Sequence, residues 1–215
     1  MERVTTVLLT GFEPFAADPT NPSGEAVRLV GTGWDGPSRL VTEVLPVTFS
    51  GAADRLGQLV ELHHPDVVIA TGLAGGRDAV TPERVAINLQ DARIPDNSGA
   101  QPVDVPCVPG GPTALFSSLP VKAIARDVAA GGIPSRVSLS AGSYVCNHVF
   151  YVAAHLAATR PGMRAGFIHV PWDTAHAPEG RPALPLSDIA AALHVAIATT
   201  LATPADISIP AGSIH

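Results

Sequence analysis

Cysteine is scarce in this chain of 215 residues: only Cys107 and Cys146 occur, far apart and without CxxC spacing. Their scarcity excludes a disulfide framework and a cysteine-rich zinc site. It is typical of a reducing compartment, so we expect a cytoplasmic location. Long apolar runs are missing too. The most apolar late segment, residues 189–202, is interrupted by His194 and two threonines. It is shorter than the ~20 residues that a membrane span needs, so no membrane association is expected.

Charged residues are also few, at 15% of the chain, and 13 basic against 19 acidic side chains give a formal net charge of −6. Such a chain lacks the positive field that attracts phosphate backbones, so we expect no nucleic-acid partner. Residues 1–5 do not have the basic start and apolar continuation of a secretory signal. The 46% hydrophobic content instead predicts compact folding, and the sparse charge favours association with further copies of the chain.

Strand-like and helix-like stretches alternate along the chain, which is the pattern of a sheet with helices on its faces. Apolar, β-branched stretches such as 5–10 and 66–71 are typical of buried parallel strands. We predict an α/β fold: a single-domain three-layer α/β/α sandwich with a mostly parallel, twisted central sheet over residues 1–215. Within this domain, the tail 204–215 has few residues that indicate a helix or a strand. The expected strands are 5–10, 40–47, 66–71, 83–89, 136–140 and 164–170.

Helix starts are predicted from residues that commonly cap or open a helix. Between the predicted helices, the stretch 91–113 is rich in Pro, Gly and Asp and predicts a long ordered loop. Loops of this length inside compact domains are usually functional or mobile. The expected helices begin at the cap Ser23 (through Val30), the cap Ser50, Pro120 (through Ala130, before Gly131 and Gly132), Cys146 (through Thr159) and the cap Ser187.

Cys146 lies where a predicted strand changes into a predicted helix, after the small residues 141–143. A thiol at a helix N-terminus faces unpaired backbone N–H groups and the positive end of the helix dipole. Both are expected to lower its pKa and favour the nucleophilic thiolate. The same N–H groups can stabilise the oxyanion of an acyl-transfer intermediate. The alternative is that Cys146 is a small buried hydrophobe, the commoner fate of a free cysteine. Cys107, in the loop, has no such setting.

A thiolate nucleophile requires a nearby imidazole that a third group orients. His169 ends a predicted strand, and functional side chains gather at the carboxyl ends of strands in open α/β sheets. The third group remains open among Glu83, Asp91 and Asp96. For Glu83, an ordinary ion pair with the adjacent Arg84 is the plain alternative.

Several motifs together resemble the pyroglutamyl peptidase I family of cysteine peptidases, in order and register from about residue 5 to 172. Separated multi-residue motifs are far more specific than any short pattern. They are Thr10–Phe15 (TGFEPF) with Asn21–Ser23, Gly75–Arg77, Thr81–Asn88 (TPERVAIN), Ala92–Asn97 (ARIPDN), Val145–His148 (VCNH) and Gly166–Pro171 (GFIHVP).

The resemblance implies a cysteine nucleophile at Cys146, a general base at His169 and an orienting acid at Glu83. It further implies an exopeptidase that removes an N-terminal pyroglutamyl (5-oxoproline) residue from peptides through a thioester, without metal or organic cofactor, as a homotetramer. Arg93 matches a position associated with the oxyanion. The substrate-binding positions that it implies are Phe12, Phe15, Asn21, Ile94, Tyr144 and Val145.

Some positions depart from the family pattern. Leu73 stands where glutamine is frequent, Tyr144 where phenylalanine is common, and Val47 where a threonine can occur. These differences bear on substrate scope more than on chemistry. Two other interpretations compete. One is a nucleoside phosphorylase or nucleosidase with a phosphate or ribose site at 72–77, and the other is a catalytically inactive relative that serves as a binding protein.

Overall fold

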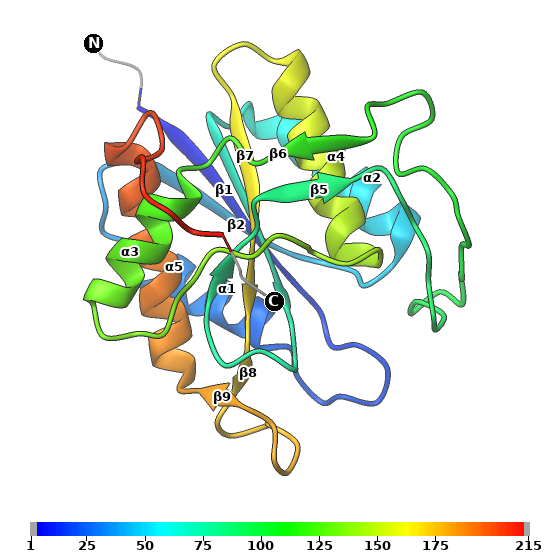
Figure 1. The fold of residues 1–215 in the computed structure, drawn as a ribbon, viewed down its shortest axis with the longest axis horizontal. Coiled ribbons are helices and arrows are strands. Elements are labelled where there is room, and N and C mark those ends of the chain that lie inside the picture. Colours follow the sequence, from blue (N-terminus) through cyan, green and yellow to red (C-terminus); the bar gives the residue numbers. More distant parts are fainter. Residues whose placement is uncertain (1–3, 213–215) are drawn as a thin grey trace.

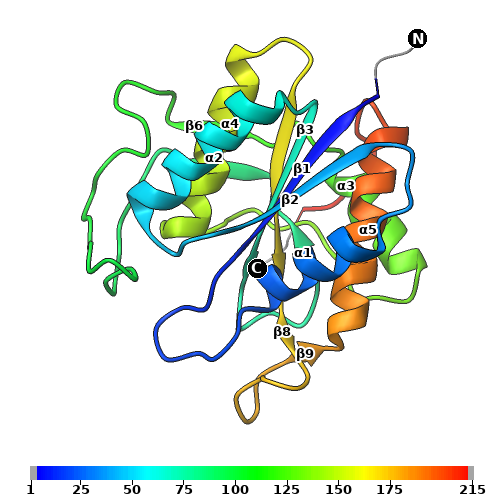
Figure 2. The same cartoon turned by 180° about the vertical axis from the view of Figure 1, so that it is seen from behind.

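The computed structural model describes residues 4–212, which form three layers with a sheet in the middle (Figure 1). Helices cover both faces of the sheet, and the opposite view shows the same layering from behind (Figure 2). The strands are β1 (Thr6–Phe12), β2 (Arg39–Leu45), β3 (Val67–Leu73), β4 (Thr81–Pro82), β5 (Val85–Ile87), β6 (Ala114–Phe116), β7 (Arg164–Val170), β8 (Trp172–Asp173) and β9 (Ala183–Leu184). The helices are α1 (Pro22–Gly33), α2 (Phe49–His63), α3 (Val121–Ala130), α4 (Val145–Thr159) and α5 (Leu186–Ala202).

The central sheet has five strands in the order β2-β1-β3-β7-β4. Its first four strands are parallel, and only the short β4 runs antiparallel to β7. The chain therefore crosses over through helices between parallel neighbours, as α/β folds require. The predicted α/β architecture with a mostly parallel sheet is confirmed.

Alternation along the strands separates two hydrophobic clusters, one on each face of the sheet. In β1, Leu8 and Phe12 point toward α2 and α4, whereas Val7 and Leu9 point toward α1 and α5. We refer to these as the first and the second core cluster. The first includes Leu56, Val149, Phe150 and Phe167, and the second includes Val27, Ile69, Ile168, Leu193 and Ile197.

Two strand predictions need correction. The predicted strand 83–89 is reduced to β5, which pairs with β6 in a separate two-stranded sheet. Residues 136–140 form no strand: Ser138 makes one isolated bridge to Glu83, and Ser135, just before the stretch, makes another to Val80. Its neighbour β4 has two residues and includes Pro82, which has no N–H to donate, so a continuous ladder cannot form. The loop 91–113 is present as predicted, with no helix or strand inside it.

The three predicted serine caps are also wrong. Asn21, not Ser23, caps α1, because its side chain accepts from the Ser23 backbone N–H. Helix α2 follows Thr48, which makes no side-chain cap, and the distant Asp96 accepts from the Phe49 N–H instead. Helix α5 starts directly after Pro185, and the Ser187 hydroxyl contacts Asp188.

None of the helices in the described part of the chain combines the length and the apolar composition that crossing a bilayer would require.

Candidate active site

Strand alternation brings three residues to one face of the sheet at the carboxyl ends of its parallel strands. Phe12 ends β1, Gly72 lies near the end of β3, and His169 lies near the end of β7. Gly72 and His169 are register partners, so they face the same side. That side is the one covered by α4. The expectation that His169 lies at the carboxyl edge of the sheet is confirmed.

Cys146 reaches the same place from α4, in the first turn of the helix. The turn before the helix uses Gly142 at φ +78, a conformation that favours glycine. A Cβ on Gly72 would lie 2.8 Å from the Cys146 Sγ, so the sulfur occupies the space above this glycine. Cys146 therefore lies beside the register partner of His169. It follows an irregular segment and not the strand that we predicted.

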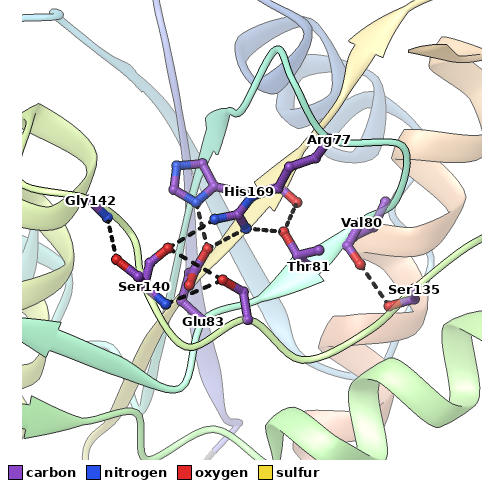
Figure 3. A network of polar contacts seen from close by, with 9 residues as sticks. Arg77, Val80, Thr81, Glu83, Ser135, Ser140, Gly142 and His169 are labelled. Carbon is purple, nitrogen blue, oxygen red and sulfur yellow. Dashed lines mark hydrogen bonds and ion pairs between the residues drawn. The ribbon is translucent and has the colours of Figure 1, made fainter. Parts of the chain in front are cut away.

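Glu83 completes the group, two residues beyond Thr81, the β4 residue that pairs with His169. Its backbone N–H donates to the Phe167 carbonyl at 2.8 Å, which fixes it against β7. The Glu83 Oε1 lies 2.8 Å from the His169 Nδ1, and both side chains are buried (Figure 3). This contact orients the imidazole with its Nδ1 toward the carboxylate.

The alternatives to Glu83 have other partners. The Asp96 carboxylate is occupied by backbone N–H groups, among them those of Phe49 and Ala100. Asp91 is exposed, and its backbone N–H donates to the Ser143 carbonyl. Arg84 does not pair with Glu83 but lies over the Phe116 ring, and Arg77 forms the ion pair with Glu83. The geometry therefore favours Glu83 as the partner of the imidazole.

Burial and charge act in opposite directions on Glu83. Burial raises the pKa of this carboxyl, but His169, Ser138 and Arg77 stabilise the carboxylate and leave the pKa below its ordinary value. For His169, burial lowers the pKa, and the charge of Arg77 lowers it further, against the opposing effect of Glu83. The resting state is therefore an ionised Glu83 beside a neutral imidazole.

The expected low pKa of the Cys146 thiol is not found. Burial raises the pKa to about 12, and the negative charge of Glu83 adds to this rise. The positive charge of Arg77 and the backbone N–H of Cys146 at the helix start lower the pKa, but they do not outweigh the loss of solvent. Cys146 consequently rests as a neutral thiol, which needs a base to become a nucleophile.

A cavity of about 210 Å³ opens beside the Cys146 thiol. Its walls are mostly apolar and aromatic, and the ring centroids of Phe15 and Tyr144 lie 5.6 Å apart. Leu73 and Val47, two of the positions that depart from the family pattern, are part of the wall. The lining residues are Phe12, Phe15, Asp18, Asn21, Val47, Leu73, Tyr144, Val145 and Cys146.

Not every predicted substrate residue lines this cavity. Arg93 and Ile94 lie exposed on the 91–113 loop and are absent from its wall. Asn21 lines it, but its side chain is engaged with Ser23 and with the Glu13 carbonyl. No role in peptidase chemistry was predicted for Arg77, Gly72 or Asp18, and the stretch 72–77 was considered only as the phosphate or ribose site of a competing interpretation. Of these, Gly72 could have been found by extending the strand alternation across β3.

Within residues 4–212, no group of three or more His, Cys, Asp or Glu side chains is arranged to hold a metal ion.

The fold and the site together define an α/β protein in which a thiol, an imidazole and a carboxylate converge beside a small apolar cavity, as in thiol-dependent hydrolases. Comparison with known proteins gives the family. Residues 5–203 match the pyroglutamyl peptidase family, and the chain belongs to it. The match extends through α5, further than the sequence motifs reached.

The relatives support this assignment over 96–97% of the chain. A pyrrolidone-carboxylate peptidase of Clavibacter michiganensis is 49% identical over 210 residues, which is 97% of this chain and 99% of that protein. The pyroglutamyl peptidase I from Bacillus amyloliquefaciens has a crystal structure with a TM-score of 0.93 and 41% identity, covering 97% of this chain and 100% of the other. The pyrrolidone carboxyl peptidase from Thermococcus litoralis gives a TM-score of 0.91 at 35% identity, covering 96% and 100%.

Proposed function

We propose that this chain is a cysteine peptidase that removes an N-terminal pyroglutamyl residue from peptides, with Cys146, His169 and Glu83 as its catalytic group. Family membership supports the reaction. The observation that carries the residue roles is the buried 2.8 Å contact between Glu83 Oε1 and His169 Nδ1, on the sheet face where the Cys146 sulfur lies against Gly72.

The cavity suits a small uncharged ring. The 5-oxoproline residue has no N-terminal charge, so it needs apolar walls and a few hydrogen bonds instead of an ion pair. Phe12, Phe15 and Tyr144 supply flat apolar surface next to the thiol. Leu73 makes the wall less polar than the glutamine that is frequent at this position in the family.

The chemistry begins with proton transfer, because the thiol rests neutral. His169 takes the proton from the Cys146 sulfur, and Glu83 stabilises the imidazolium that forms. The thiolate then attacks the carbonyl that links 5-oxoproline to the next residue. The C–N bond breaks as His169 returns the proton to the leaving amine, which leaves a thioester on Cys146. Water, activated by His169, hydrolyses the thioester and releases 5-oxoproline.

Negative charge on the carbonyl oxygen requires donors during both steps. The Cys146 and Asn147 backbone N–H groups precede the first intrahelical hydrogen bond of α4, which the His148 N–H makes to the Tyr144 carbonyl, so they have no intrahelical acceptor. Arg93 is a second donor in this proposal. Its guanidinium forms no hydrogen bond or ion pair with the other described residues, so it remains available to substrate.

The proposal also includes the setting of the enzyme. We infer one domain over the chain and a cytoplasmic homo-oligomer, a tetramer by family resemblance. Exposed apolar side chains support association: Phe116 on β6 is 70% exposed and Leu139 is 46% exposed. Sedimentation velocity at micromolar concentration measures the assembly, and a monomer there would contradict the oligomer.

Serine in place of Cys146 tests the mechanism. Because a hydroxyl in this site is a far weaker nucleophile than a thiolate, Cys146→Ser should lower cleavage of a pyroglutamyl-coumarin reporter by about 10³-fold or more while the protein stays folded. Cys107→Ser is the matched control. That thiol is buried against the Ile87 and Leu89 carbonyls, with its pKa raised to about 11, and its replacement should leave turnover near normal. Near-normal cleavage by Cys146→Ser would refute the mechanism.

A further inference from the structure

Arg77 lies at the centre of the polar network around Glu83, although it belongs to the loop between β3 and β4 (Figure 3). Its Nη1 donates to the Glu83 Oε1 at 2.5 Å and contacts the Thr81 hydroxyl. Its Nη2 donates to the Ser140 carbonyl at 2.9 Å. One guanidinium thus joins β4, the carboxylate beneath the imidazole, and the segment that leads into α4.

The contact with Glu83 matters because this carboxylate has no exposed surface. An ionised carboxylate in such a place is costly unless charged or polar partners surround it. The Glu83 Oε1 has two partners, Arg77 and His169, whereas the Oε2 is buried without a hydrogen-bond partner. Arg77 is the only group with a permanent positive charge among these contacts. Together with the contacts to His169 and Ser138, it therefore helps to keep the carboxylate ionised when the imidazole is neutral.

The contact with Ser140 connects Arg77, and through it Glu83, to the segment that leads to the nucleophile. Ser140 begins the turn that passes through Gly142 to Cys146, and the Gly142 N–H donates to the Ser140 hydroxyl at 3.2 Å. Two arms of the same guanidinium therefore fix the distance between the Glu83 carboxylate and this turn. Arginine suits this role because its planar fork presents several donors in fixed directions, which lysine cannot do.

We propose that Arg77 is a positioning residue for the catalytic group: it holds Glu83 ionised and in place, and thereby controls proton transfer from Cys146 to His169. The proposal rests on the proposed function of the site. It goes beyond the catalytic group because Arg77 contacts neither the substrate cavity nor the reacting atoms.

The charge of Arg77 has a direct electrostatic consequence. It lowers the pKa of the Cys146 thiol and also the pKa of the His169 imidazole. Its removal raises both, so the acid limb and the alkaline limb of the pH–rate profile both move to higher pH. A purely structural arginine would lower the amount of active enzyme without moving the limbs. The pH profile therefore separates the two roles.

The test compares Arg77→Met, Arg77→Lys and Arg136→Met. Arg77→Met should lower kcat by about 10- to 100-fold, as expected for one charge-assisted hydrogen bond, with little change in KM and with the profile shifted to higher pH. Arg77→Lys keeps the charge but not the fork, so its profile should stay near that of the parent while kcat falls less. Arg136 lines the same surface groove as Arg77 but pairs with the exposed Asp78, and Arg136→Met should behave like the parent.

A second measurement does not depend on the substrate. The rate at which iodoacetamide alkylates Cys146 is followed against pH in a Cys107→Ser background. Arg77→Met should slow alkylation near neutral pH, because the thiolate becomes rarer. If the parent enzyme does not cleave the pyroglutamyl reporter, the proposed function fails while alkylation still tests Arg77. Should Arg77→Met not fold, Arg77→Gln replaces it. An unchanged pH dependence in a folded neutral variant, or a loss confined to KM, would overturn the proposal.

Discussion

Gly72 has no side chain, and the Cys146 sulfur occupies the space that a side chain would fill. A Cβ there would also lie 2.9 Å from the Phe167 ring, so the position admits no larger residue without displacing the nucleophile or the core. Cys146 packs over this glycine and also lines the cavity. The absence of a side chain at Gly72 thus helps to fix the position of the attacking Cys146 sulfur.

His148 is a second residue whose burial has a consequence. Its ring packs near Phe49, with centroids 6.1 Å apart, and its Nδ1 is buried without a hydrogen-bond partner. Burial lowers the pKa of His148 to about 4, against an opposing effect of Asp54. In the folded chain it therefore stays neutral at pH values where the unfolded chain binds a proton.

The free energy of unfolding should therefore fall as the pH is lowered from about 6.5 to about 4, with roughly 3 kcal/mol contributed by His148. Above pH 6.5 the histidine is neutral in both the folded and the unfolded chain, so it does not make the free energy of unfolding depend on pH. His148→Leu removes the titrating group. Urea unfolding at pH 7 and pH 4 measures the loss for each protein, and an equal loss in parent and variant would contradict this origin.

At the scale of residues, the sequence predicted which residues form the candidate site better than it predicted their pKa values. Cys146 and His169 were predicted as candidates because each lies at the end of a predicted regular element, whereas Glu83 was selected over Asp91 and Asp96 only by the family resemblance. The neutral resting state of Cys146 was not predictable, because it depends on burial by β3 and on the charge of Glu83. Arg77 was missed because its partners lie 6 and 63 residues away along the chain.

Among the elements, the long loop 91–113 contributes no residue to the cavity wall but is hydrogen-bonded to Tyr144, which lines the cavity. The Tyr144 hydroxyl donates to the Pro95 carbonyl at 2.9 Å, and the Asn97 side chain donates to Glu13 and to the Pro14 carbonyl. The loop is thus attached to the cavity wall at one end. At the other end, the Tyr151 hydroxyl donates to the Pro112 carbonyl at 2.6 Å.

Tyr144→Phe removes the hydroxyl and keeps the ring in the cavity wall. Losing one hydrogen bond of this kind should raise KM by about two- to tenfold, and kcat should fall with it, because residues 93–95, which include the proposed oxyanion donor Arg93, are held less firmly. Hydrogen exchange of residues 93–96 should accelerate. Tyr151→Phe loses the same kind of bond away from the cavity and should lower stability by about 1 kcal/mol while leaving KM unchanged. Equal KM values in Tyr144→Phe and the parent would argue against this function of the hydroxyl.

Helices and strands were predicted well where the signal is local. Strand β7 begins and ends at the predicted residues, and α4 starts only one residue early. The serine caps failed for α2 because the acceptor for its first N–H is Asp96, 47 residues away. The stretch 136–140 failed as a strand because its neighbour β4 is too short, which no local pattern reveals.

At the scale of the molecule, the end of the described chain is attached to α3. Helix α3 follows Pro120 and has no side-chain cap of its own. The Asp206 carboxylate accepts from the Lys122 and Ala123 N–H groups, both at 3.0 Å, and the Lys122 Nζ donates to the Ile209 carbonyl. A residue more than 80 positions later along the chain thus supplies the cap.

Asp206→Ala should lower the free energy of unfolding by about 1 kcal/mol, the usual value of an N-cap. For a chain of this size the midpoint of thermal unfolding should fall by about 2–4 °C. Because we expect a single domain, calorimetry should show one transition that moves as a whole. Glu179→Ala, at an exposed loop position, is the control and should change little. Two separate transitions would contradict the single domain.

The two core clusters differ in what depends on them. The first contains Phe12, Val47 and Val145, which also line the cavity, whereas no residue that lines the cavity belongs to the second. Side chains between α1 and α5 can therefore be repacked for heat resistance while the nucleophile and its base keep their positions. A directed-evolution library limited to this half of the protein should yield variants that unfold at higher temperature with little loss of turnover.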